Sequence, residues 1–142
     1  MLLVRWIHVL SAITWIGGML FIALVVVPVA RRLDDPALKR RLIQQLGMRF
    51  RTVSWIALVL LVLTGLLNLW AHPFLLTSPR FLWKLGLVIW SLMLSALHDF
   101  VVGPRAGAPD AADAARLRAS WIARINMVVA IVIVLLGLSL VG

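Results

Sequence analysis

The sequence predicts an all-α integral membrane protein, an up-down bundle of four spanning helices joined by short loops. Of its 142 residues, 63% are apolar and only 13% are charged, and the mean hydropathy is +1.07. Such values are typical of proteins whose solvent is the lipid bilayer. The apolar residues also form four runs, and each is close to the roughly 20 residues that a helix needs to cross a bilayer. Because these runs nearly exhaust the chain, we expect a single transmembrane domain over residues 1–142.

The predicted helices cover residues 4–30, 53–71, 81–102 and 120–141. The first run is too long for the apolar part of a signal peptide, and it ends in the basic segment 28–32 instead of a small-residue cleavage site. We therefore expect it to be retained as a helix.

The loop after the first helix has a pattern of its own. Asp35 is placed to cap a helix whose first turn carries Pro36, and Gly47 is placed to end it. Leucines recur at four-residue spacing in between, at Leu38, Leu42 and Leu46. This pattern predicts an amphipathic helix that lies at the membrane interface.

The loop after the third helix has a different composition. Glycines and prolines should break the third helix, at Gly103, Pro104, Gly107 and Pro109. Residues 110–118 then suggest a helical lead-in to the fourth helix. A proline followed by an arginine after helices one and three, and a Ser-Trp-Ile-Ala run at the start of helices two and four, suggest duplicated hairpins.

Orientation follows from the basic residues, because Lys and Arg are in excess on the cytoplasmic side of a membrane. Two segments hold most of them: Arg31, Arg32, Lys39, Arg40, Arg41, Arg49 and Arg51 in the first, and Arg105, Arg116, Arg118 and Arg124 in the second. We expect a bacterial-type plasma membrane location with both termini outside. Anionic lipid headgroups account for the net charge of +9, so the expected partner is membrane lipid and no nucleic acid.

Polar side chains in the apolar runs indicate where function lies, because unmatched polar groups at bilayer depth are costly. Since consecutive spanning helices are antiparallel, these residues separate into two ends. The outer end holds Arg5, Trp6, His8, Asn68, Trp70, His72, Arg80, Trp83 and Lys84, and the inner end holds His98, Asp99, Arg105, Arg124, Asn126 and Met127. His8 and His72 can therefore meet at one ligand, whereas His8 and His98 cannot share a metal within one protomer.

One stripe of the first helix carries a histidine among small residues and tryptophan, at His8, Ser11, Ala12, Trp15, Gly18 and Met19. One interpretation is a close-packed helix seam, which membrane bundles commonly build from small residues. The other is that the small residues make room for a flat cofactor whose iron His8 ligates.

The run from His8 to Gly18, HVLSAITWIGG, resembles the opening helix of the copper resistance protein D (CopD) superfamily and of the related HemJ-type protoporphyrinogen oxidases. The segments 83–105 and 124–126 are similar to later helices of the same families. The resemblance implies either copper handling or haem b binding with porphyrinogen oxidation. It matches His8 and His98 to the family histidines and Lys84 to the family lysine, and it gives His72 no counterpart.

Ligand chemistry favours haem over copper. A copper(I) route favours thiolate and thioether ligands, yet Cys is absent and the five Met residues form no paired array. Haem b needs one or two axial ligands, an apolar slot, and cations for its propionates. The expected outer site has His8 and His72 as ligands, Trp15 and Gly18 on the inward stripe, and Arg5, Arg80 and Lys84 as cations. An interfacial belt of Trp with snorkelling Arg and Lys explains the same outer residues without a cofactor.

The inner end is a second expected site, where His98 can ligate iron with Met127 or a group of another protomer. Alternatively, Asp99 and Arg124 form a buried ion pair that includes His98, and Asn126 satisfies a backbone group. We therefore expect a haem b redox protein that transfers electrons with a quinone or a periplasmic partner, or oxidises a porphyrinogen as a haem-dependent membrane oxidoreductase. A copper transport or resistance protein that uses His8, His72 and His98 is one alternative. A non-catalytic structural subunit is another, and homo-oligomers fit each case.

Overall fold

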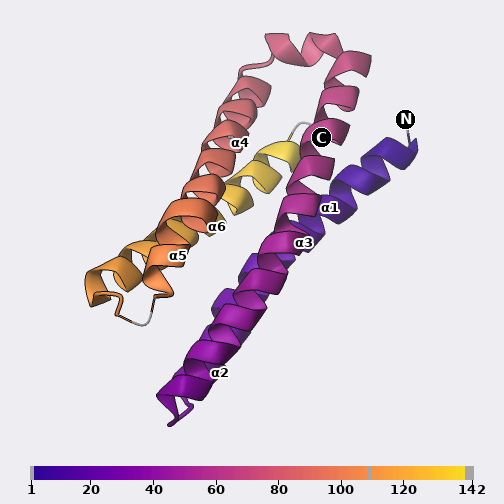
Figure 1. Ribbon diagram of the computed structural model, residues 1–142. Coiled ribbons are helices and arrows are strands. Elements are labelled where there is room, and N and C mark those ends of the chain that lie inside the picture. Colours follow the sequence, from indigo (N-terminus) through magenta and orange to yellow (C-terminus); the bar gives the residue numbers. More distant parts are fainter. Residues whose placement is uncertain (1, 109, 140–142) are drawn as a thin grey trace. The chain divides into compact units, whose positions relative to one another are not determined.

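The computed structural model describes residues 2–108 and 110–139, and these are almost entirely helical with no strand among them (Figure 1). Four helical stretches are long and apolar enough to cross a membrane, namely Leu2–Arg31, Pro36–Ala71, Pro79–Ala106 and Asp113–Leu138. The predicted all-α fold class with four spans is therefore confirmed. The predicted break at Pro109 and the predicted helix end at residue 141 lie outside the described residues.

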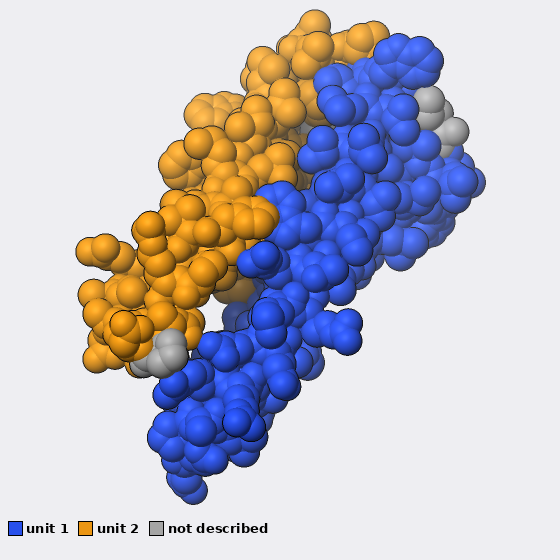
Figure 2. Space-filling view, in the orientation of Figure 1, with its two compact units in different colours: residues 1–72 blue, residues 73–142 orange. Residues whose placement is uncertain are grey.

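The chain divides into two compact units, residues 1–72 and 73–142 (Figure 2). Unit 1 contains α1 (Leu2–Phe21), the π-helical segment η1 (Ile22–Val26), α2 (Val27–Arg31) and α3 (Pro36–Ala71). Unit 2 contains the 3₁₀ segment η2 (Pro73–Thr77), α4 (Pro79–Leu97), the π-helical segment η3 (His98–Val102), α5 (Gly103–Ala106) and α6 (Asp113–Leu138). Each unit is thus a hairpin of two long helices.

In unit 1, α1 packs along α3 through small and polar residues. The α1 side of this contact includes Ser11 and Trp15, each only 5% exposed. The α3 side is formed by Ser54, Ala57, Leu58 and Thr64, all buried. Small side chains let two backbones approach closely, which is how helices associate where lipid removes the hydrophobic driving force. Ser11 and Trp15 of the stripe that begins at His8 therefore contribute to helix packing.

The N-terminal part of α3 differs from the prediction. Asp35 caps the helix as expected, with its carboxylate accepting a hydrogen bond from the Ala37 backbone N–H at 2.8 Å. Gly47, however, does not end it, and the helix continues unbroken from Pro36 to Ala71. The predicted separate interfacial helix was wrong, because a lone interior glycine costs only about 1 kcal/mol and good helix formers follow it. At about 1.5 Å per residue, α3 is longer than the hydrocarbon layer is thick.

In unit 2, α4 packs on α6 around a buried polar cluster. The Ser91 hydroxyl donates to Oδ1 of Asn126 at 2.5 Å, and Nδ2 of Asn126 donates to the Ser95 hydroxyl at 2.9 Å. Ala130, which is fully buried, continues the contact along α6. One interpretation of the sequence gave Asn126 a backbone partner, and the structure adds two bonds to serine side chains of the facing helix.

Both units contain a π-helical turn just before a proline. In η1 the N–H of Val27 bonds to the carbonyl of Ile22, and Pro28 follows. In η3 the N–H of Gly103 bonds to the carbonyl of His98, and Pro104 follows. A proline lacks an N–H and crowds the preceding turn, so a locally widened turn accommodates it. The predicted break at Gly103 and Pro104 was therefore wrong, since the helix continues through α5 to Ala106.

The two hairpins also share a contact upstream of their π-helical turns. His8 lies 14 residues before Ile22, and Lys84 lies 14 residues before His98. In each hairpin this side chain lies against a glycine of the second long helix, His8 at Gly65 and Lys84 at Gly137. This correspondence agrees with the duplication that the sequence suggested.

Candidate functional site

His8 is held inside the hairpin of unit 1 by the middle of α3. Its Nδ1 lies 2.8 Å from the Thr64 hydroxyl oxygen. Its Cε1 lies against Gly65, where an added Cβ would be 3.6 Å away. Thr64 is 5% exposed, so the hydrogen bond is formed among packed side chains. The glycine and the threonine of α3 thus fix the position and the rotation of the imidazole.

The hydrogen-bond pattern around Thr64 determines which nitrogen of His8 carries the proton. The Thr64 hydroxyl donates to the Leu60 carbonyl of its own helix at 2.6 Å. A hydroxyl has one proton to donate, so its oxygen accepts from the Nδ1–H of His8. In the neutral ring the lone pair then lies on Nε2. Histidines that ligate metals through Nε2 are held in this way by an acceptor at Nδ1.

His72 lies at the C-terminal end of α3 and has the same tautomer. Its backbone N–H bonds to the Leu69 carbonyl, and its Nδ1 lies 3.1 Å from the Asn68 carbonyl oxygen. Because a carbonyl only accepts, Nδ1 is again the donor and Nε2 carries the lone pair. The two groups that anchor His8 and His72, at Thr64 and Asn68, are one helical turn apart on α3, or about 6 Å. The structure thus brings both histidines to the same end of the unit 1 hairpin.

The side chain of Asn68 lies between these two anchors and is only partly satisfied. Its Oδ1 is buried and has no hydrogen-bond partner among the described residues. A buried amide oxygen without a partner costs about 1 to 3 kcal/mol. Thr64, Asn68 and His72 recur every four residues, so they form one polar stripe along α3. An unmatched acceptor within this stripe is consistent with a ligand or a water at this end.

Trp15 and Gly18, expected to line a cofactor slot, both take part in the helix packing of unit 1. Trp15 is buried in the α1–α3 contact. At Gly18, an added Cβ would collide with the ring of Phe50. The position of a Cβ at Gly18 is therefore occupied by an α3 side chain.

The expected outer cations lie in both units. In unit 1, Arg5 is exposed on α1 beside Trp6. In unit 2, Arg80 Nη1 donates to the Ser139 carbonyl at 3.5 Å, and Lys84 Nζ is close to Gly137. Arg80 and Lys84 thus lie near the C-terminal end of α6, where the helix dipole and the last carbonyls favour positive charge. These contacts with the end of α6 explain the positions of Arg80 and Lys84 within unit 2, and the sequence did not predict them.

The expected inner site is partly assembled within unit 2. Nδ1 of His98 lies 2.8 Å from Oδ1 of Asp99, in the π-helical turn η3. Gly103 directly follows this turn, and its N–H bonds to the His98 carbonyl. An added Cβ at Gly103 would be 2.8 Å from that carbonyl oxygen, so a side chain would be crowded at this position. Arg124 lies over the ring of Trp121, with its Cζ 5.4 Å from the ring centroid. His98 and Asp99 are therefore paired as expected, whereas an ion pair between Asp99 and Arg124 stays a prediction.

The sequence did not single out Thr64 and Gly65, although a signal for Thr64 was present. It lies four residues before Asn68 and eight before His72, so a period of one turn joins the three. Gly65 carried no such signal, because a glycine inside an apolar helix is equally compatible with lipid. The described residues contain no group of three or more His, Cys, Asp or Glu side chains that could hold a metal ion.

The fold and these sites define a multi-pass membrane protein of two helical hairpins, with histidines held between or at the ends of its helices. Residues 10–115 match the family described as "Domain of unknown function (DUF4149)", and the chain belongs to this family. An uncharacterized protein of Aquifex aeolicus (strain VF5) is 32% identical over 139 residues, covering 95% of this chain and 91% of that protein. No solved structure matches the chain.

Proposed function

We propose that this protein binds haem b at the outer side of a bacterial plasma membrane and works there as a redox protein. His8 and His72 are the proposed axial ligands, and both termini are outside. The observation that carries the proposal is the hydrogen bonding of the two histidines. Both donate through Nδ1 to an oxygen of α3, which directs the lone pair of each neutral ring to Nε2.

The surroundings of the two histidines support a tetrapyrrole over a bare metal ion. Haem b supplies four nitrogen ligands to its iron and needs only one or two ligands from the protein. The described residues contain no group of three metal-binding side chains. The buried, unmatched Oδ1 of Asn68 indicates that this end is polar inside an apolar hairpin. These features fit haem better than a copper(I) route, which would favour sulfur ligands.

Positive charge near the proposed ligands supports the same proposal. Arg5 lies on α1 one turn before His8 and is available to a propionate. The resemblance of the segments around His8, Lys84 and His98 to CopD-like and HemJ-type proteins agrees with a metal or haem function. Membership of those families is part of the proposal.

The residues of this chain would have separate tasks in such a site. Bound haem b supplies a reversible one-electron couple at its iron. Thr64 and the Asn68 carbonyl would hold the two imidazoles in the ligating tautomer and fix the orientation of the rings. The apolar helices exclude water from the iron and thereby influence its potential. Electrons would be exchanged with a quinone or a periplasmic partner, or taken from a porphyrinogen.

The test is an absorption spectrum of the protein purified in detergent after expression with ample haem supply. We expect a Soret band and sharp α and β bands after dithionite reduction. His8→Ala should abolish or strongly reduce the Soret band, and His72→Ala should convert the iron to a five-coordinate spectrum. The matched control is Thr52→Val, which lies on the exposed side of α3 and should leave the spectrum unchanged.

Two results would contradict the proposal. One is the absence of a Soret band in folded wild-type protein that has been offered haemin. The other is a spectrum that neither histidine variant alters. Copper measured on the same samples separates the alternatives, since stoichiometric copper without haem would favour copper transport, and neither metal would favour a structural subunit.

A further inference from the structure

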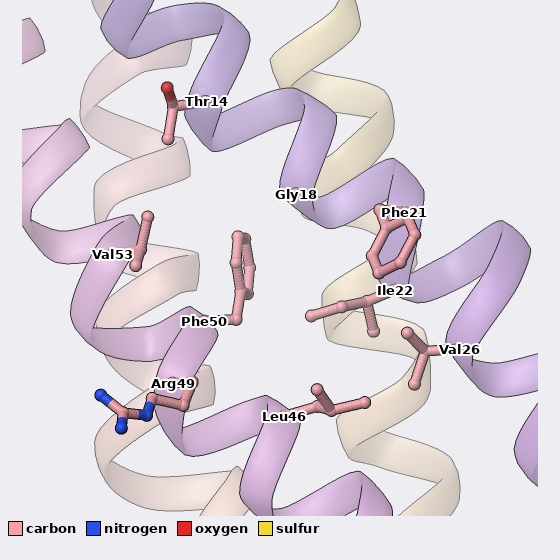
Figure 3. Close-up of a pocket in the computed structure, with 9 residues that line it drawn as sticks. All are labelled: Thr14, Gly18, Phe21, Ile22, Val26, Leu46, Arg49, Phe50 and Val53. Atoms are coloured by element: carbon pink, nitrogen blue, oxygen red, sulfur yellow. The ribbon is translucent and has the colours of Figure 1, made fainter.

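Unit 1 contains an open apolar groove of about 230 Å³ between α1 and α3, near the turn that joins these helices (Figure 3). It lies well away in sequence from His8 and His72. The α1 wall includes Gly18 and Ile22, and the α3 wall includes Phe50 and Val53. The π-helical turn η1 forms the end of the α1 wall, since Ile22 and Val26 both line the groove.

The lining is suited to a hydrocarbon chain. Its only hydroxyl, that of Thr14, donates to the Leu10 carbonyl of its own helix at 2.9 Å. The volume is below the roughly 300 to 1,000 Å³ of sites that enclose drug-sized molecules. A polar ligand would find few partners inside, and a ring system as large as a porphyrin would not fit. A single acyl chain is both apolar and narrow enough for this groove.

The groove depends on specific packing between the two helices. Gly18 provides the surface on which the Phe50 ring rests, because a Cβ at this position would occupy the place of the ring. Figure 3 shows that ring lying between Gly18 and Val53, with Ile22 and Leu46 farther along the groove. A π-helical turn, which often marks functional positions in helices, widens α1 at this point.

Positive charge is found at one edge of the groove. Arg49 lines it, and in Figure 3 its guanidinium is directed away from the apolar side chains. A long Arg side chain can lie along apolar surface while its charge stays among polar groups. This arrangement matches an anionic phospholipid, with its chain in the groove and its phosphate at the guanidinium.

We propose that the groove between α1 and α3 binds one anionic phospholipid, whose acyl chain lies along Phe50, Ile22 and Val53 and whose phosphate contacts Arg49. The site is independent of the proposed haem site. Bound lipid would stabilise the hairpin of unit 1 at its basic end, because a ligand that binds only the folded state stabilises that state.

The experiment is native mass spectrometry of the full chain, delipidated in detergent and then offered phosphatidylglycerol or phosphatidylcholine with identical acyl chains. We expect one phosphatidylglycerol to be retained in preference to phosphatidylcholine. Arg49→Gln should weaken phosphatidylglycerol retention about fivefold, the order expected for one basic residue at an anionic headgroup. Arg41→Gln removes the same charge outside the groove and should change retention less than about twofold by the same argument.

A second pair of variants tests the apolar part of the site. Val53→Phe should fill the groove and reduce retention of both lipids, whereas Val59→Phe is a comparably exposed change on α3 outside it. Equal retention of the two lipids, or equal effects of Arg49→Gln and Arg41→Gln, would overturn the proposal. So would folded wild-type protein that retains neither lipid. None of these outcomes depends on whether the protein contains haem, so failure of this proposal can be distinguished from failure of the proposed haem site.

Discussion

All three histidines of the chain use Nδ1 for a hydrogen bond to an oxygen acceptor. The acceptor is a hydroxyl for His8, a backbone carbonyl for His72 and a carboxylate for His98. In each neutral ring Nε2 then carries the lone pair. Acceptors of this kind orient metal-ligating histidines and raise their basicity, so the three rings share a feature that packing alone does not require.

Thr64→Val tests the contribution of the hydroxyl that holds His8. The variant keeps the shape of the side chain but removes the acceptor of the Nδ1–H. Loss of such an outer partner typically weakens metal binding by roughly 10- to 100-fold, and we expect a decrease of about tenfold in haem affinity together with a higher midpoint potential. Haemin titration and redox titration measure the two effects. Thr52→Val removes a hydroxyl that bonds to the Met48 carbonyl within α3, and an equal effect there would contradict a specific role of Thr64.

At this scale the sequence drew attention to the polar residues of the apolar runs but did not predict their hydrogen-bond partners. His8, His72 and His98 were identified because ionisable groups are rare in apolar runs. Their acceptors depend on how two helices are aligned, and the apolar pattern does not specify that register. Thus the sequence assigned Gly18 to a cofactor slot, whereas the ring of Phe50 fills its space.

Small and polar contacts determine how the helices of each hairpin pack. In unit 1 the contact relies on Gly18, Ser54 and Ala57, and in unit 2 it relies on Ser91, Asn126 and Ala130. Many large apolar side chains remain exposed on the outer surfaces of both hairpins. Since lipid solvates these side chains, association depends on close packing and interhelical hydrogen bonds.

Two adjacent glycines of α1 offer a test of close packing. Gly18→Ala places a methyl group in the position of the Phe50 ring, whereas nothing lies within 4 Å of a Cβ at Gly17. We expect Gly18→Ala to lower the free energy of unfolding by about 1 to 3 kcal/mol, as overpacking does. Gly17→Ala should leave it unchanged or raise it. Unfolding by denaturant in detergent micelles measures both, and equal effects of the two variants would refute the packing role of Gly18.

The Asn126 amide tests the polar part of the α4–α6 contact. Asn126→Leu removes both hydrogen bonds to serine, and such bonds in membrane helices contribute about 0.6 kcal/mol on average and up to about 1.7 kcal/mol. We expect a loss of stability of about 1 kcal/mol on the same scale. A double-mutant cycle with Ser91→Ala should reveal a coupling energy between the two positions, whereas strictly additive effects would exclude an energetic role of the bond.

At the scale of elements, the sequence located all four spans but not their ends. The apolar runs end where charged residues begin, yet α3 includes a basic segment, and the third spanning helix runs from α4 through η3 and α5 to Ala106. Helical hydrogen bonds continue wherever no residue prevents them, and charged residues such as Arg and Lys are good helix formers. Composition therefore predicts which part of a helix lies in the hydrocarbon layer, but it does not predict where the helix begins and ends.

The whole chain is a basic, cysteine-free protein of two hairpins with four apolar spans. Its basic residues are concentrated after the first span and around the third loop, which predicts that both segments lie in the cytoplasm. The apolar composition was sufficient to predict the class of fold. The function depends instead on the chemistry of a few side chains, so it is inferred from their hydrogen bonds and not from composition.

The absence of cysteine makes the orientation directly testable. Single cysteines introduced as Asp34→Cys, Ala114→Cys and Leu76→Cys lie in the three loops or at their edges. With both termini outside, a membrane-impermeant maleimide should label residue 76 in intact cells, and it should label residues 34 and 114 only after permeabilisation. The reverse pattern would contradict the orientation and with it an outer location of His8 and His72.

The central claim, ligation of one haem iron by His8 and His72, is tested most directly by electron paramagnetic resonance of the oxidised protein. Two imidazole ligands predict a low-spin ferric signal in the wild type, and loss of either ring in His8→Ala or His72→Ala should produce a high-spin signal or remove the haem. A high-spin wild type, a low-spin signal that survives in both variants, or folded protein without ferric haem would contradict the claim.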